Sequence, residues 1–128
     1  MDLLDSNLYD LIGEDGFRRL VAGFYRRVAV DDLIGPMYPP EDLAGAEERL
    51  RDFLVGRFGG PMRYVQQRGH PRLRMRHAPF SIDRTARDRW ISLMELAMAE
   101  AALPEQAERP LRQFFNDAAT HMINVADG

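Results

Sequence analysis

The chain contains no cysteine and no lysine, and all 17 of its basic side chains are arginine. Without cysteine, disulfides, thiolate catalysis, iron–sulfur clusters and cysteine-ligated zinc are excluded. Without lysine, Schiff-base chemistry and a phosphate-binding P-loop are excluded as well. No apolar run approaches the roughly 20 residues of a membrane span, and the acidic N-terminus lacks the pattern of a signal peptide. We therefore expect a cytoplasmic protein with no membrane partner.

The composition is that of a globular protein. Hydrophobic residues make up 45% and charged residues 29% of the 128 positions, close to the average for soluble domains. This length fits one core, so residues 1–128 are expected to form a single domain. The formal net charge of −3 argues against nucleic acid as the main partner.

Apolar residues recur every three or four positions in four segments, which predicts amphipathic helices over 15–30, 43–58, 82–102 and 104–125. Asp15, Asp42 and either Ser81 or Asp83 are candidate N-caps. Gly59 and Gly60 are expected to end the second helix, and Pro110 to kink or restart the last one. The residues expected on the buried faces are Phe17, Leu20, Val21, Phe24, Val28, Leu43, Ala46, Leu50, Phe53, Leu54, Phe58, Ala86, Trp90, Leu93, Met94, Ala97, Leu111, Phe114, Phe115, Ala118, Met122 and Val125.

Between the two helix pairs, residues 61–79 show no periodicity. A long irregular segment inside a compact domain is usually functional. The fold class expected is therefore all-α, with helix pairs on either side of a loop-rich middle.

The catalytic inventory is small. No HExxH, GxSxG or glycine-rich phosphate loop is present, and the carboxylates fall on expected solvent faces, so a hydrolase is improbable. Of the three histidines, His77 lies in the irregular segment, where it is either a structural side chain or a metal ligand; one histidine suffices to hold a haem iron. His70 and His121 are expected in structural or surface roles, His121 on the buried side of the last helix.

Three aromatic side chains with polar tips fall on or beside the apolar stripes: Tyr25, Tyr38 and Trp90. Their O–H and N–H groups need partners when buried. Each is either a core aromatic bonded to the backbone or part of a set of donors aimed into one apolar cavity. Such donors suit a bound diatomic ligand with partial negative charge.

Several segments, spanning roughly Leu8 to Asn124, resemble the group II (O-type) truncated haemoglobins. They are FYRRV, YPPEDLAGAEERLRDFL, GGPMRYVQQRGHPRLRMRHAPFSI and ARDRWISLM. The resemblance implies a truncated globin, a two-over-two helical sandwich around haem b (iron protoporphyrin IX).

The resemblance also implies roles for individual residues. His77 matches the proximal iron ligand, Tyr25 and Trp90 match donors to the bound ligand, and Tyr38 matches the aromatic at the inter-helix corner. The positions expected to contact the haem or its propionates are Ala46, Arg49, Leu50, Phe53, Leu54, Tyr64, Arg76, Phe80 and Met94. Ala46 stands where ordinary globins carry a distal histidine, so a histidine gate is absent, and apolar Leu50 removes one possible donor.

The function implied is tight binding of O₂ and other diatomic ligands, NO and CO among them. Redox chemistry with NO or peroxide would follow rather than O₂ transport, and any enzymatic turnover would need an unidentified reductase. A haem-based gas or redox sensor is the alternative, and a haem-free helical interaction protein is a third. Oligomeric state stays open.

Overall fold

The computed structural model describes residues 3–78 and 80–125. Within these ranges all regular structure is helical, which confirms the all-α class. The elements are α1 (Leu3–Val28), the 3₁₀ turns η1 (Gly35–Met37) and η2 (Pro40–Asp42), α2 (Leu43–Arg57), α3 (Arg63–Arg68), α4 (Leu73–His77), α5 (Arg84–Ala101) and α6 (Glu105–His121). The ends of the expected 1–128 domain and Pro79, the last residue of the expected irregular segment, lie outside the described residues.

α1 is two helical pieces joined at Gly13, whose φ of 81° and ψ of 161° are not helical. Glycine adopts such a positive φ at low cost because it has no Cβ. The second piece agrees with the expected helix, but the turns from Leu3 onward were not predicted. The helix ends at Val28 because the Asp31 carboxylate accepts the Ile34 backbone N–H at 2.8 Å and fixes a turn there.

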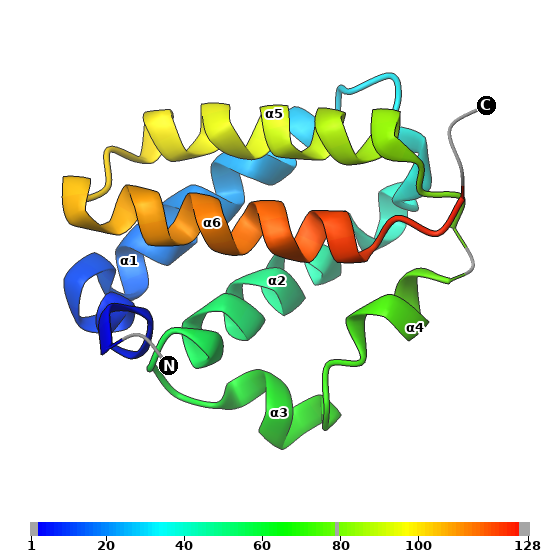
Figure 1. Ribbon diagram of the computed structural model, residues 1–128. Coiled ribbons are helices and arrows are strands. Elements are labelled where there is room, and N and C mark those ends of the chain that lie inside the picture. Colours follow the sequence, from blue (N-terminus) through cyan, green and yellow to red (C-terminus); the bar gives the residue numbers. More distant parts are fainter. Residues whose placement is uncertain (1–2, 79, 126–128) are drawn as a thin grey trace.

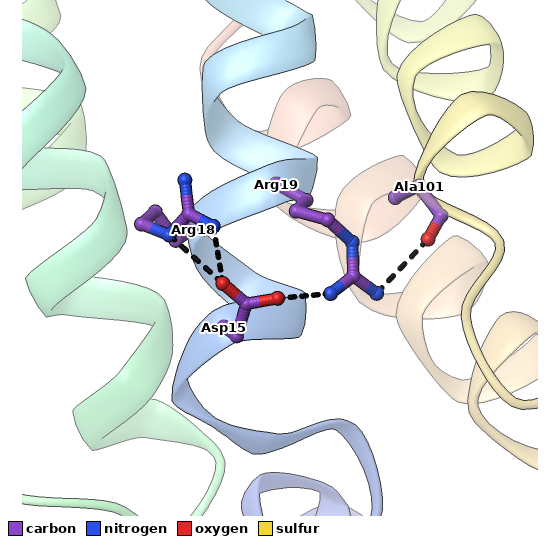
Figure 2. Close-up of polar contacts among 4 residues, drawn as sticks. All are labelled: Asp15, Arg18, Arg19 and Ala101. Carbon is purple, nitrogen blue, oxygen red and sulfur yellow. Dashed lines mark hydrogen bonds and ion pairs between the residues drawn. The ribbon is translucent and has the colours of Figure 1, made fainter.

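Asp15 does not act as the expected N-cap. Figure 2 shows its carboxylate between the guanidinium groups of Arg18 and Arg19, and it accepts hydrogen bonds from both. Arg19 also donates to the Ala101 carbonyl at 3.1 Å. A cation at the C-terminal end of α5 complements the helix dipole, so this pair joins α1 to the end of α5.

α2 starts after Asp42, as expected, although Asp42 makes no side-chain cap bond and pairs with Arg49 instead. Gly59 (φ 102°) follows its last turn, which confirms the expected glycine end. At Gly60 a Cβ would lie 2.6 Å from both the Tyr9 ring and a Val55 methyl. Glycine is therefore required where the chain leaves α2 and passes the start of α1.

The middle of the chain is more regular than expected. It contains α3 and α4, each of less than two turns, where the sequence predicted an irregular loop. Such helices are too short to show an amphipathic period, and they are not stable in isolation because helix nucleation is unfavourable.

α5 begins at the Asp83 N-cap, whose carboxylate accepts from the Ala86 N–H at 2.8 Å. Of the two candidate caps, Asp83 is therefore the one used. α6 follows the Pro104 N-cap and passes Pro110 as one helix, so the expected restart is wrong. His121 and Val125 are exposed, not on a buried face, because α6 ends at His121 and the chain turns away.

The helices are arranged as two packed pairs. α1 packs on both α2 and α5, and α5 lies beside α6. Figure 1 shows α5 and α6 side by side over α1 and α2, with α3 and α4 running along one edge. The core between the pairs is formed by fully buried aromatic and aliphatic residues: Leu8, Phe17, Leu20, Val21, Phe24, Val28, Leu54, Val55, Phe58 and Leu111. Among the described residues, no helix is long and apolar enough to cross a membrane.

Candidate functional site

A cavity of about 340 Å³ lies between the helix pairs and the α3–α4 segment. Cavities of this size hold small ligands and parts of cofactors. All six α-helices contribute to its lining. The predicted site residues that line it are Tyr25, Tyr38, Ala46, Arg49, Leu50, Phe53, Leu54, Tyr64, Arg76, His77, Phe80 and Trp90.

Tyr25, Tyr38 and Trp90, which we call the donor wall, are hydrogen-bonded to one another. The Tyr38 hydroxyl oxygen accepts a hydrogen bond from the Trp90 indole, and the hydroxyls of Tyr38 and Tyr25 are hydrogen-bonded to each other. The rings of the two tyrosines are perpendicular, with centroids 5.6 Å apart. Three elements far apart in sequence, α1, the η1–η2 turn and α5, thus bring their polar tips to one side of the cavity.

Both tyrosines of the donor wall stay protonated. Tyr25 is 8% exposed, and burial, the largest effect, raises the pKa of its hydroxyl strongly, with the hydrogen bond to Tyr38 adding to it. Burial also raises the pKa of Tyr38. Neutral phenols are hydrogen-bond donors, so the wall presents protons, not negative charge.

The donor wall rests on core aromatics. The Trp90 indole contacts the Phe24 ring at 5.0 Å and the Phe115 ring at 5.8 Å between centroids. Phe24 also contacts Tyr25, edge-on, at 5.1 Å. Phe24 is fully buried and therefore holds both side chains in place.

α2 supplies an apolar wall. Ala46 and Leu54 are buried, while Leu50 and Phe53 are half-buried because they face the cavity. The Phe53 ring also meets the Tyr64 ring at 5.8 Å. No polar side chain of α2 other than Arg49 is among the cavity-lining residues of the described chain.

The two predicted arginines, Arg49 and Arg76, line the cavity and are held by protein partners. Arg49 donates to Asp42, with the shorter N–O distance 2.6 Å. This ion pair raises the pKa of Arg49 and lowers that of Asp42. Arg76 donates to the Pro71 carbonyl at 2.8 Å, and its guanidinium carbon lies 5.9 Å from the centroid of the Tyr64 ring.

His77 is the last residue of α4 and is half-buried. Its ring centroid lies 6.5 Å from that of Phe80. Its backbone carbonyl accepts a hydrogen bond from the side chain of Asn124. His70 and His121 are exposed and line a wider cleft between α6 and residues 70–75. This cleft adjoins the cavity and shares with it the lining residues Phe53, Phe114, Ala118 and Met122.

One predicted site residue lies elsewhere. Met94 is 1% exposed and belongs to the core, and it is not among the residues that line the cavity. It follows Trp90 by four residues, about 6 Å along the helix. That rise places Met94 beyond the residues that line the cavity.

The cavity is also lined by residues that the sequence did not predict as site residues. They are Ile34, Met37, Pro39, Asp42, Ile82, Ala86, Arg87, Phe114, Phe115, Ala118, Ala119 and Met122. The sequence predicts the apolar stripe of α6 as a buried face. In the structure Phe114, Ala118 and Met122 of this stripe are only half-buried, because the stripe borders a cavity. No sequence signal distinguishes Arg87, whose side chain is bonded to Thr120 and Asn116 on α6.

This donor set fits a haem. Among the described residues, no group of three or more His, Cys, Asp or Glu side chains could hold a bare metal ion. A porphyrin brings four of its own nitrogen ligands and needs only one axial imidazole from the protein. The cavity offers His77, apolar walls, and arginines suited to carboxylates.

Comparison with known proteins agrees with this fit. Residues 7–124 match the family model described as bacterial-like globin. A group 2 truncated hemoglobin from Bacillus subtilis (strain 168) is 38% identical over 119 residues, 93% of this chain and 89% of the relative. The X-ray structure of a thermostable hemoglobin from the actinobacterium Thermobifida fusca superposes with a TM-score of 0.87 at 49% identity, covering 91% of this chain and 96% of that one.

A third similar structure is that of a truncated oxygen-avid haemoglobin from Bacillus subtilis, with a TM-score of 0.86, 38% identity and coverage of 91% and 98%. Fold and site together define a globin. The chain belongs to the bacterial-like globin family, as a group II truncated haemoglobin. This membership makes it a haem-based ligand-binding protein.

Proposed function

We propose that this truncated haemoglobin holds haem b through His77 and binds O₂ tightly beneath the donor wall. The observation that supports the proposal is that His77 and all three donor-wall residues line one cavity. In our proposal the tightly held O₂ serves redox chemistry rather than transport. The name of one similar protein, a truncated oxygen-avid haemoglobin, is consistent with tight binding.

The haem would supply an iron that takes a diatomic ligand. The residues of this chain would then divide the remaining tasks. His77 would hold the iron from one side, and Arg49, Arg76 and Tyr64 would contact the propionates. The apolar contacts would come from Ala46, Leu50, Phe53, Leu54 and Phe80.

Tyr38 is the centre of the donor wall in this proposal. Its hydroxyl is hydrogen-bonded to both Tyr25 and Trp90; in our proposal it accepts from both, which would occupy both lone pairs and leave its own proton to donate. Chains of hydrogen bonds polarise one another, and the two incoming bonds would make that proton a better donor to the ligand. A rotation of Tyr25 or Trp90 would add a second donor.

The magnitude of this effect is large enough to decide between storage and release. A hydrogen bond in a dry pocket is worth roughly 1–2 kcal/mol. Two of them slow ligand release by a factor on the order of 10 to 10³, since about 1.4 kcal/mol is tenfold. One or two donors from this wall would therefore favour retention of O₂ over rapid exchange.

Retained O₂ is suited to reaction with nitric oxide. One O₂, one NO and one electron give one nitrate ion, and the electron would come from an external reductase. The same donors could polarise hydrogen peroxide, which two electrons and two protons convert to two waters. A steady-state assay of NO consumption with an added reductant separates this proposal from a gas or redox sensor, which would bind ligand without turnover.

The experiment that tests the donor wall measures O₂ dissociation by stopped flow. The variants are Tyr25→Phe, Tyr38→Phe and Trp90→Leu, alone and combined. The proposal predicts faster release, with the largest single effect in Tyr38→Phe. Tyr9→Phe is the matched control, because the Tyr9 hydroxyl bonds Glu14 at 3.0 Å and does not line the cavity. Unchanged release in all the donor-wall variants would overturn the proposal.

A further inference from the structure

The side chain of Asn124 connects the end of α6 to the backbone around His77. Its Nδ2 donates to the His77 carbonyl at 3.3 Å and to the Phe80 carbonyl at 2.8 Å. Its Oδ1 accepts from the Ile82 backbone N–H at 2.8 Å. Although much of Asn124 is exposed, one amide group thus satisfies three backbone groups between α4 and α5.

The backbone of Asn124 adds to this connection. Its N–H donates to the Ile82 carbonyl at 2.9 Å, and the next N–H, of Val125, reaches the same oxygen at 3.3 Å. Two carbonyls face the amide nitrogen and one N–H faces the amide oxygen. An asparagine amide matches this pattern in one orientation, since the reverse would place its oxygen against two carbonyl oxygens.

α4 needs such an attachment. It has five residues and ends at His77, and no helix pair that includes α4 is among those that pack closely in the described chain. α6, by contrast, is a 17-residue helix with buried Ala107, Leu111 and Phe115 against the core. The Asn124 contacts therefore join a weakly packed helix to a well-packed one.

We propose that Asn124 is a positioning residue for His77. Its amide fixes the His77 carbonyl relative to α6, and the imidazole then keeps one direction toward the iron. This inference rests on the proposed function, in which His77 holds the haem. It requires no contact between Asn124 and the haem, and Asn124 is not among the cavity-lining residues.

The test uses the haem-loaded protein and two variants with different losses. Asn124→Ala removes all three side-chain bonds. Asn124→Asp keeps an acceptor for the Ile82 N–H but loses both donors and sets a carboxylate against the two carbonyls. Asn116→Ala is the matched control, because Asn116 lies on α6 and bonds Arg87 and the Arg112 carbonyl, away from the His77 backbone.

Two measurements are made on each variant. Resonance Raman spectroscopy of the ferrous protein reports the iron–imidazole stretching band, and hydrogen exchange reports the Ile82 amide. We expect both Asn124 variants to shift or broaden the band. The Ile82 amide should exchange about tenfold faster in Asn124→Ala, the loss of one hydrogen bond, and stay protected in Asn124→Asp. Asn116→Ala should change neither.

Two results overturn the inference alone: a parent-like band in Asn124→Asp, or a shift of equal size in Asn116→Ala. A parent protein with no iron–imidazole band, or with a band that survives His77→Gly, would instead overturn the proposed function and this inference with it. The amide exchange of Ile82 reports the Asn124 contact whatever the haem does, so the two failures are distinguishable.

Discussion

The two sides of the cavity are held in different ways. Two residues of the donor wall, Tyr25 and Trp90, stand on α1 and α5, which pack closely together, and both rings rest on fully buried Phe24. Tyr38 lies between η1 and η2, with its ring centroid 5.6 Å from that of Tyr25. The proximal segment, which we define as residues 61–78 and 80–82, carries His77 on short helices with exposed Met62, Val65, Met75 and Phe80. Tyr25 thus belongs to the core and Tyr38 and Trp90 pack against it, whereas His77 is attached from outside it.

Apart from α3, whose buried Tyr64 packs against Phe53 of α2, the proximal segment is attached by polar contacts. At its start Arg63 pairs with Glu14 of α1 through two N–O contacts of 2.9 Å, and at its end Asn124 binds the backbone. Regions with little buried apolar surface open locally at low free energy. Because the two sides differ in buried apolar surface, we expect the donor wall to keep its geometry without haem and the proximal segment to need haem for its order.

The largest expected difference is between two phenylalanines, one on each side. Phe24→Ala removes a fully buried ring and should lower the free energy of unfolding by about 3–5 kcal/mol. Phe80→Ala removes a ring that is 39% exposed and should cost less than about 1 kcal/mol. Urea denaturation of the haem-loaded proteins, followed by circular dichroism, measures both. Equal losses would show that the proximal segment belongs to the core after all.

Haem removal should change the amide exchange rates of the two sides differently, and this effect is smaller in free energy than that of Phe24→Ala. A ligand stabilises the parts of the protein that its binding holds in place. Amides of the proximal segment should exchange faster by a factor on the order of 10 to 100 without haem, while those of α1 and α5 change little. Hydrogen exchange with mass spectrometry checks this. A comparable increase in α1 and α5 would contradict the idea of a self-supporting donor wall.

Part of the fold and most of the site residues could be predicted from the sequence. The stripe from Phe17 to Val28 followed from spacing, and side-chain chemistry narrowed the cap of α5 to Ser81 or Asp83, of which the structure uses Asp83. The cavity brings together twelve of the thirteen predicted site residues. Met94 lies in the core outside that lining, and a stripe gives the face of a helix but not the position along it. α3 and α4 were missed because their stability comes from tertiary contacts, such as those of Arg63 and Asn124, that span tens of residues.

The smallest expected effect concerns pH and the start of the proximal segment. Hydrogen bonds from Arg63, the largest cause, lower the pKa of Glu14 below its ordinary value of 4.5. A group whose pKa falls on folding stabilises the fold above its unfolded pKa and loses that contribution as pH drops through the folded value. The pair is partly exposed, so the stabilisation is about 0.5 kcal/mol or less.

Acid titration of stability tests this pair. The difference in unfolding free energy between the parent and Glu14→Gln should be present at pH 6 and shrink below about pH 4.5, the ordinary glutamate value. A difference that stays constant down to pH 3 would mean that Glu14 contributes by packing and not by its charge, and the polar attachment would then be weaker than described.

The absorption spectrum of the haem-loaded protein tests the central claim most directly, since the proposed function assigns the iron to His77, one of the three histidines of the chain. His77→Gly should lose the parent ferrous spectrum and regain it with added imidazole, while His70→Ala and His121→Ala keep it. An unchanged spectrum in His77→Gly, or loss of the spectrum in either of the other two variants, would contradict the account.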